Sequence, residues 1–322
     1  MLAAMRFGLA LPQYGFSLPT GRIRSDDAVR WARRADDLGF DSVWLSDHLF
    51  YSFGRYGADP APIAALEPLT ALAAVATETA RVRLGVLVLA AGFRPPELVA
   101  KAAATIDRLS GGRLELGLGA GWLEEEFVAF GYRFGTIGER FAALEQTLRR
   151  LTRSLTDRGS PGPSPVQDRV PIWLGGKGGP RLLRLAARYA TGWNLVWRVP
   201  PEDHAGRVAD IVAACGREGR DPATFRRTVG LYGTVGLTEH DARARFERAR
   251  ASFPGRSMRD ETWETWRADT LSGSPEQVVD RVRAFEALGV DELILSPWAL
   301  PFAVIEPEIV EVFAEHVMPA CR

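Results

Sequence analysis

Few residues in this chain of 322 could bind a metal or form a disulfide. It contains two cysteines, Cys215 and Cys321, and four histidines spread along its length, at positions 48, 204, 240 and 316. Two cysteines cannot build a disulfide framework or a cysteine-based zinc cluster, and scattered histidines do not indicate a histidine-rich metal site. We therefore expect no metal site, and the cysteine usage predicts a reducing, cytoplasmic environment.

The chain also lacks a net charge and a long apolar segment. Forty lysines and arginines balance forty aspartates and glutamates, so no net field attracts nucleic acid or an anionic membrane. The apolar run at residues 1–13 is interrupted at Pro12 and is too short for a signal or membrane segment. Only Lys101 and Lys177 are lysines, an arginine bias typical of a GC-rich genome. We expect neither nucleic acid nor a membrane as a partner.

The residues that are present describe an ordinary globular protein. The chain is 46% hydrophobic, 10% aromatic and 25% charged, which leaves ample apolar surface to bury. By length alone it could form one large domain or two smaller ones.

Short β-rich segments alternate with amphipathic helical segments along the whole chain. Eight strands are expected, over residues 5–13, 40–46, 81–90, 113–121, 170–176, 192–197, 225–235 and 290–296. Helical patterns cover residues 29–38, 66–79, 96–109, 139–155, 180–190, 201–219, 276–288 and 305–317. Eight strand–helix units whose strands are apolar on both faces predict an α/β fold, the (β/α)8 TIM barrel. A doubly wound sheet is the alternative, but the first turn, at residues 11–13, lacks its glycine-rich fingerprint.

Two segments depart from this regular alternation. Residues 157–169 are rich in proline and glycine and predict a surface loop. Residues 236–272 fit no strand–helix unit and contain a charged helix, so we interpret them as an insertion at the seventh βα connection. The prediction is a single barrel domain over residues 1–322.

Function in such a barrel gathers at the C-terminal ends of the strands. Asp47 and His48 follow the second strand, where an imidazole that titrates near neutrality suits acid–base chemistry. The simpler alternative is that Asp47 caps the loop and His48 bonds locally. The position at a strand end favours a functional role.

Closely spaced glycines follow the fifth strand at residues 175–179. They are joined by Lys177 and Arg181 at the start of a helix, where backbone N–H groups and the helix dipole attract anions. The pattern is not a P-loop, because no Gly-Lys-Ser/Thr follows. A plain βα turn is the alternative, but the two cations favour a phosphate site.

Glycines also end the fourth strand, at residues 117–121, where backbone could approach a ligand closely. The three glutamates that follow, at positions 124–126, could simply be the solvated first turn of a helix. The apolar segment 84–91 could be barrel wall or a flat surface for a ring system. Five tryptophans near the predicted mouth would suit a large planar ligand, although most tryptophans serve packing: Trp44, Trp122, Trp193, Trp197 and Trp298.

These motifs together resemble the luciferase-like monooxygenase superfamily, whose members are TIM barrels that bind FMN or the deazaflavin coenzyme F420. The matching segments are FGLALPQ at residues 7–13, GFDSVWLSDHL at 39–49, FRPPELVAKAAATIDRLSGGRLELGLGAGWLEEEF at 93–127, GERFAALEQ at 138–146, PIWLGGKGGPRLLRLAARYATGWN at 171–194 and GSPEQVVDRVRAFEALGVDELIL at 273–295. They cover nearly the whole chain except residues 198–272.

The resemblance implies roles for particular residues. Asp47 and His48 match the Asp-His pair of the F420-dependent branch, in which the aspartate contacts the deazaflavin and the histidine acts where hydride moves. The family's non-prolyl cis peptide would fall at Leu87-Val88, or else at residues 85–86. Further matched residues are Ala90, Gly121 and Glu125 as cofactor contacts, and Gly178, Gly179 and Arg181 as the phosphate loop. Trp122 stands where the sugar-phosphate dehydrogenase branch carries a catalytic glutamate, which argues against a sugar-phosphate substrate.

By this resemblance we expect a coenzyme F420-dependent oxidoreductase that moves hydride between F420 and a small organic substrate, with His48 as proton donor or stabiliser. One alternative is an FMN-dependent two-component monooxygenase with a separate reductase. Another is a catalytically silent flavin-binding subunit, although such a subunit would need neither the Asp-His pair nor the glycine loop. An aldolase-type barrel lacks a Schiff-base lysine. A homodimer and a separate flavin or F420 reductase are possible partners.

Overall fold

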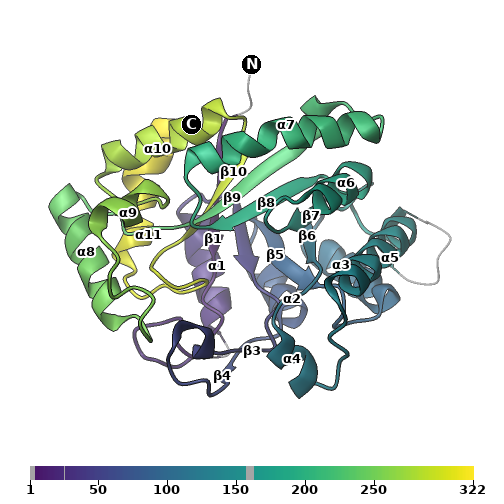
Figure 1. The fold of residues 1–322 in the computed structure, drawn as a ribbon, viewed down its shortest axis with the longest axis horizontal. Helices are drawn as coiled ribbons and strands as arrows, with labels where there is room; N and C mark the ends of the chain where they lie inside the picture. The colour runs from purple at the N-terminus through teal and green to yellow at the C-terminus, as the bar shows by residue number, and fades with distance from the viewer. Residues whose placement is uncertain (1–3, 25, 157–162) are drawn as a thin grey trace.

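The computed structural model describes residues 4–24, 26–156 and 163–322. Eight parallel strands form a closed barrel in which each strand pairs with the next barrel strand along the chain and the last pairs with the first. They are β1 (Arg6–Ala10), β2 (Ser42–Leu45), β5 (Arg83–Ala90), β6 (Leu114–Gly119), β7 (Ile172–Gly175), β8 (Gly192–Trp197), β9 (Arg226–Tyr232) and β10 (Glu292–Ser296). The predicted TIM barrel is confirmed (Figure 1).

Helices surround the barrel (Figure 1). Apart from α8 (Glu239–Ser252) of the insertion, the longer ones are α1 (Asp27–Asp37), α2 (Pro68–Glu78), α3 (Pro96–Leu109), α5 (Ile137–Thr156), α6 (Pro180–Tyr189), α7 (Pro201–Arg217) and α10 (Pro275–Ala287). The predicted last helix is α11 (Glu308–Val312) followed by a π-helical turn (Phe313–Val317) and a 3-10 turn (Met318–Cys321). Within the described residues, no helix has the length and apolar character to cross a membrane. Residues 157–162 of the predicted loop lie outside the described part, and residues 163–169 form neither helix nor strand.

Short elements that the sequence patterns did not reveal lie at the C-terminal end of the barrel strands. After β2, the antiparallel pair β3 (Phe50–Tyr51) and β4 (Ile63–Ala64) encloses a 3-10 turn (Gly54–Tyr56), and after β6 comes α4 (Glu124–Ala129). A second 3-10 turn (Pro222–Thr224) lies instead at the opposite end of the barrel, directly before β9. Strands of two residues are too short to show a periodicity, which is why sequence analysis missed them. The hairpin and α4 project together at the bottom of Figure 1.

The predicted insertion at residues 236–272 holds α8 (Glu239–Ser252) and α9 (Trp263–Ala268), between β9 and α10. Both helices begin with a capping box, which satisfies backbone N–H groups at their N-termini. The segment leaves and re-enters the barrel at adjacent points, because Gly236 N donates to Gly273 O at 3.2 Å. The insertion is therefore anchored at both ends beside the mouth of the barrel.

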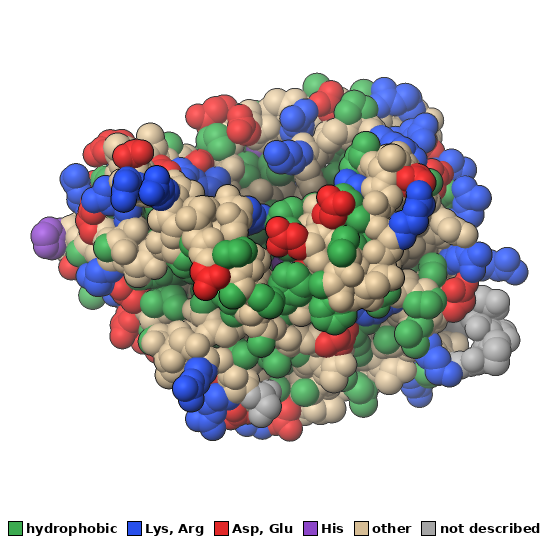
Figure 2. All heavy atoms as spheres, turned by 60° about the horizontal axis from the view of Figure 1, so that its bottom comes forward, with side chains coloured by type: hydrophobic (Ala, Val, Ile, Leu, Met, Phe, Trp, Pro, Cys, Tyr) green, Lys and Arg blue, Asp and Glu red, His purple; other side chains and the backbone are tan. Residues whose placement is uncertain are grey.

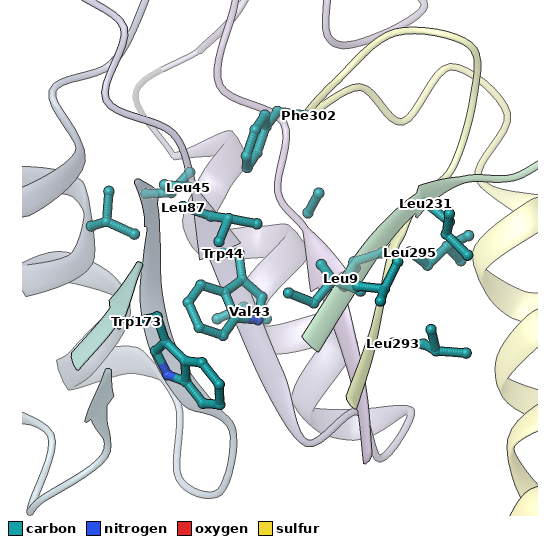
Figure 3. Close-up of a cluster of buried hydrophobic side chains, with 14 of the residues drawn as sticks. Leu9, Val43, Trp44, Leu45, Leu87, Trp173, Leu231, Leu293, Leu295 and Phe302 are labelled. Carbon is teal, nitrogen blue, oxygen red and sulfur yellow. The ribbon is translucent and has the colours of Figure 1, made fainter. Parts of the chain in front are cut away.

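Large side chains packed against glycines fill part of the inside of the barrel. Trp44 and Trp173 are fully buried (Figure 3). A Cβ atom at Gly85 would lie 2.2 Å from the Trp44 ring, and one at Gly192 would lie 2.9 Å from the Trp173 ring. Glycines on neighbouring strands thus provide the space that the two indoles occupy.

A network of two arginines and two glutamates fills the N-terminal end of the barrel. Arg6 pairs with Glu292 and Arg83 with Glu115, and Arg6 also lies 3.5 Å from Glu115. Trp173 Nε1 donates to Glu115 at 2.6 Å. Burial raises the pKa of Glu292, although Arg6 opposes this. Because the formal charges cancel, the network can be buried inside the barrel.

The glycine–tryptophan contact yields a prediction about stability. We expect Gly85→Ala to lower the free energy of unfolding by about 1–3 kcal/mol, because the added methyl group overlaps the Trp44 ring and overpacks the interior. Denaturant unfolding followed by circular dichroism measures the change. The control is Gly206→Ala in α7, where no atom lies within 4 Å of the added methyl; it should raise stability by up to about 1 kcal/mol through helix propensity. Equal effects of the two substitutions would contradict the packing argument.

His204 of α7 is buried against the outside of the barrel. Its ring stacks on Trp193 with 5.9 Å between centroids, and neither ring nitrogen has a hydrogen-bond partner among the described residues. Burial, with a smaller contribution from the Arg227 charge, lowers the pKa of His204 from 6.5 to about 4. The folded protein therefore holds this histidine neutral.

A pH dependence follows, since the unfolded chain takes up a proton at His204 at a higher pH than the folded protein does. The contribution of His204 to the free energy of unfolding is fully present above pH 6.5 and is lost as the pH drops toward 4. The loss between pH 7.5 and 5 is about 2 kcal/mol. We expect His204→Leu to remove that part of the pH dependence, and His240→Gln, at an exposed position, to retain it. Unfolding measured at both pH values tests this, and the same loss in wild type and His204→Leu would refute it.

Candidate active site

A cavity of about 540 Å³ opens at the C-terminal end of the barrel strands, and its size is typical of small-molecule sites. Figure 2 looks onto this end of the molecule, where hydrophobic side chains gather in a band across the middle of the face. Six of the predicted site residues line the cavity: Asp47, His48, Leu87, Val88, Ala90 and Gly121. The structure thus brings together residues from β5 and from the ends of β2 and β6.

One wall of the cavity is an irregular part of β5. The peptide bond Leu87-Val88 is cis, at the first of the two positions that the resemblance implied, and the pairing of β5 with β6 shifts register there. The Val88 side chain lies between glycines of two neighbouring strands. A Cβ atom at Gly117, Gly119 or Gly175 would come within 3.0, 2.7 or 2.6 Å of a Val88 methyl group. These glycines let Val88 form an apolar floor.

Asp47 is held by a bidentate ion pair. Both carboxylate oxygens accept from the Arg94 guanidinium at 2.8 Å, and Oδ2 also accepts from Ala90 N at 2.9 Å. Arg94 further contacts Glu67 at 2.6 Å. Burial alone would lower the pKa of Arg94, but its bonds to Asp47 raise it. Asp47 therefore ties the end of β2 to β5 and to the segment before α3; its contact with a cofactor stays a prediction.

His48 is held by Glu126 of α4. The His48 Nδ1 and Glu126 Oε1 atoms lie 2.9 Å apart, and the same oxygen accepts from Leu49 N at 3.1 Å. A carboxylate only accepts, so Nδ1 carries the proton and Nε2 is left without a hydrogen-bond partner among the described residues. The ring packs edge-on against Trp122 and Tyr51. The arrangement is that of an oriented acid–base group at a cavity wall.

The three glutamates of α4 have different environments. Glu124 and Glu125 are exposed, as expected for a solvated first turn, whereas Glu126 is only 2% exposed and faces the cavity. Sequence analysis missed Glu126 as a site residue. No local sequence signal separates it from Glu124 and Glu125, because its contact with His48 joins residues 78 apart along the chain. Glu125, matched to a cofactor contact, lies outside the cavity lining, and its role stays a prediction.

The predicted phosphate loop reaches the cavity with its first residues. Residues 175–177 line the cavity, while Gly178, Gly179 and Arg181 lie just beyond, at the N-terminus of α6. Lys177 forms no hydrogen bond or ion pair with any described residue, so its charge is free to meet an anion. Arg181 instead packs over the Phe141 ring at 5.2 Å. A phosphate at this loop stays a prediction.

Aromatic rings enclose the rest of the cavity. Of the five tryptophans predicted near the mouth, Trp122 and Trp197 line it; the others are buried in packing, and they are Trp44, Trp193 and Trp298. Phe302 lies nearer the mouth than Trp44 (Figure 3). It has φ 55°, unusual for an aromatic residue, and its N–H donates to Ser296 Oγ at 3.1 Å. In the part of the chain that the structure describes, no group of His, Cys, Asp and Glu could hold a metal ion.

The chain belongs to the luciferase-like monooxygenase family, whose model matches residues 5–292. It is therefore a member of a family of flavin- and F420-dependent oxidoreductases, as the resemblance implied.

Two curated relatives are both 32% identical to it. One is the phthiodiolone/phenolphthiodiolone dimycocerosates ketoreductase of Mycobacterium sp. (strain JLS), matched over 70% of this chain and 66% of the relative. The other is the F420-dependent glucose-6-phosphate dehydrogenase of Amycolatopsis mediterranei, matched over 56% of each. The chain thus spans between about half and two thirds of the length of these relatives.

Solved structures share the fold at lower identity. An F420-dependent secondary alcohol dehydrogenase in complex with an F420-acetone adduct superposes with a TM-score of 0.78 at 18% identity, covering 99% of this chain and all of that one. The EDTA monooxygenase of Chelativorans sp. superposes with a TM-score of 0.77 at 17% identity, covering 98% of this chain and 93% of that one. At such identities the likeness establishes the fold alone.

Proposed function

We propose that the protein is a coenzyme F420-dependent oxidoreductase that moves hydride between F420 and a small organic substrate. The observation that carries the proposal is His48, oriented by the buried Glu126 at the wall of the same cavity that Val88 and the strand-end glycines form. The resemblance of the Asp47-His48 pair to the F420 branch supports it, as do the names of the F420-dependent relatives.

The residues of the cavity fit a planar ring with an anionic tail. Leu87 and Val88 provide an apolar floor, and side chains at the facing glycines would collide with Val88. At one edge, the unpaired Lys177 and the N-terminus of α6 offer positive charge and free N–H groups to phosphate. When bound there, F420 supplies the carbon that gives or accepts a hydride. Leu87, Val88, Ala90 and Lys177 would hold it, together with the glycines of the loop.

The chain's own residues manage the proton and exclude water. In the reduction of a carbonyl, His48 donates the proton that the carbonyl oxygen takes up; in the oxidation of an alcohol, the neutral imidazole accepts it. Glu126 keeps the ring oriented through the contact between its Oε1 and His48 Nδ1. The Asp47–Arg94 pair fixes the position of the segment that carries His48.

The substrate that we propose is not a sugar phosphate. Trp122 occupies the position of the catalytic glutamate of that branch, and its ring lies against His48 and under the Arg55 guanidinium, 4.6 Å from the ring centroid. An indole at this position supplies neither a proton nor a hydrogen-bond acceptor to a hydroxyl group.

A second candidate is an FMN-dependent monooxygenase, because a monooxygenase shares the fold with nearly the same TM-score. It would work with a separate flavin reductase. A catalytically silent subunit is disfavoured, because it would have no need of an imidazole held by a buried carboxylate. A homodimer, an F420 reductase partner and a cytoplasmic location belong to the main proposal.

The test of the cofactor is a pair of titrations of the purified protein, with F420 and with FMN, followed by fluorescence. We expect F420 to bind at least tenfold more tightly. Lys177→Gln should weaken binding severalfold, and the loss should shrink at high salt because a charge–charge attraction is screened. Lys101→Gln, on α3 and exposed, is the matched control and should bind as wild type does. Preference for FMN would favour the monooxygenase, and binding of neither would refute both.

The role of His48 is tested by turnover with a panel of ketones and reduced F420. His48→Ala should lower the rate by roughly 100-fold, the usual loss for a general acid, and keep cofactor affinity within a few-fold. Glu126→Gln should slow the reaction by about tenfold or more, because the imidazole loses the charge-assisted hydrogen bond that orients it. Glu124→Gln is the control on the same helix and should react at the wild-type rate. Wild-type turnover by His48→Ala would show that this histidine is only structural.

A further inference from the structure

A second cavity, of about 330 Å³, lies beside the first at the mouth of the barrel. The two share Val196 and Trp197 as a common wall, and both are open to solvent. The remaining lining comes from the turn after β3, from the ends of β8, β9 and β10, and from the insertion, through Phe253, Ser257, Met258 and Trp266. The second cavity is therefore formed between the mouth of the barrel and the insertion, a segment without a counterpart in a plain (β/α)8 barrel.

Flat aromatic rings dominate the lining. Trp197 stacks on Tyr232 with 5.7 Å between centroids and 17° between planes, and Tyr232 stacks on Trp266 at 6.0 Å and 9°. Tyr56 and Phe253 form a second, edge-to-face pair in the same lining. Nearly parallel rings offer a wall that another planar ring can pack against.

The cavity offers no free charge. Its one charged lining residue among those described is Arg198, which is bound by two carboxylates. Arg198 Nε lies 2.7 Å from Asp269 Oδ1, and its Nη1 lies 2.7 Å from Glu261 Oε2. A phosphate or carboxylate would have to displace one of these carboxylates, so a neutral ligand fits better.

Tyr232 adds a hydroxyl group to this aromatic lining. Tyr232 is 9% exposed, and its hydroxyl forms no hydrogen bond with another described residue. Burial raises the pKa of Tyr232, so the hydroxyl keeps its proton at neutral pH. It can donate one hydrogen bond to an oxygen or nitrogen of a ligand.

We propose that this second cavity, lined by Tyr56, Trp197, Tyr232, Phe253, Met258 and Trp266, holds a neutral, flat, largely apolar ring system of the substrate. The inference rests on the proposed function, in which the reacting carbon lies beside His48 in the first cavity. The substrate extends from the first cavity into the second past the common wall of Val196 and Trp197. Tyr232 donates a hydrogen bond to an acceptor atom of the ring system. The substrates are then neutral aromatic or polycyclic ketones and alcohols.

The first experiment needs neither cofactor nor turnover. N-phenyl-1-naphthylamine, a neutral naphthalene that fluoresces in apolar surroundings, is titrated into the purified protein. We expect saturable binding at one site. Ser257→Trp fills the exposed rim of the cavity, and Met258→Glu places a charge in its lining; each should weaken binding at least tenfold. Leu237→Trp, at an exposed position of the insertion outside the lining, is the control and should bind as wild type does.

Met258 is buried, so its substitution could disturb folding; Ser257→Trp keeps the test decisive because Ser257 is exposed. Equal binding by wild type and Ser257→Trp would overturn the proposal. So would displacement of the probe by saturating F420, since this would place the probe in the first cavity.

The second experiment compares two ketones with reduced F420. Ser257→Trp should raise the KM for 2-acetonaphthone at least tenfold with little change in kcat, and leave the KM for cyclohexanone within twofold. Equal shifts for both ketones would overturn the proposal. A third outcome is that Ser257→Trp weakens binding of the probe but neither ketone is reduced. This result would refute the proposed function and leave the ligand class of this cavity supported.

Discussion

The space inside an eight-stranded barrel is the constraint on which this structure depends, because such a barrel has room for little more than its own side chains. Trp44 fits only because glycines stand at Gly8 and Gly85, and Trp173 only because one stands at Gly192. Below them, paired arginines and glutamates fill the N-terminal end of the barrel. Above them, glycines at the ends of β6 and β7 accommodate the Val88 side chain, and the cavity at the mouth is the volume that remains above it.

Buried charges connect this cavity to the surrounding elements. Asp47 can be nearly buried because Arg94 neutralises both its oxygens, and Glu126 because it accepts from His48 and from a backbone N–H group. Each pair joins the end of β2 to a different neighbour, the segment before α3 in one case and α4 in the other. The imidazole therefore has its orientation set before any ligand binds, which is the preorganisation that acid–base catalysis requires.

The two cavities are built in different ways. The first is formed by strand ends and the loops that follow them directly, so the barrel itself positions its walls. The second depends on the insertion, whose α8 and α9 are anchored where the chain leaves β9 and returns to α10. A division follows from this construction. Under the proposed function, the barrel would provide the cofactor site and the added segment the surfaces that contact the substrate.

The sequence by itself determined the barrel, because eight strands and their helices each carry a periodicity that neighbouring residues alone establish. It also located Asp47, His48 and the glycine loop, since strand ends in a barrel converge on one face. The resemblance to a known family pointed to Leu87-Val88. Only the tertiary structure decided the partners of those residues. Glu126 lies 78 residues from His48 along the chain, and Arg94 lies 47 from Asp47. The stacking of Trp197 with Tyr232 and Trp266 likewise joins three separate segments. A local sequence pattern indicates which face of a strand or helix a residue lies on. Contacts between residues so far apart in the sequence depend on how the strands close into the barrel and how the insertion packs against its mouth.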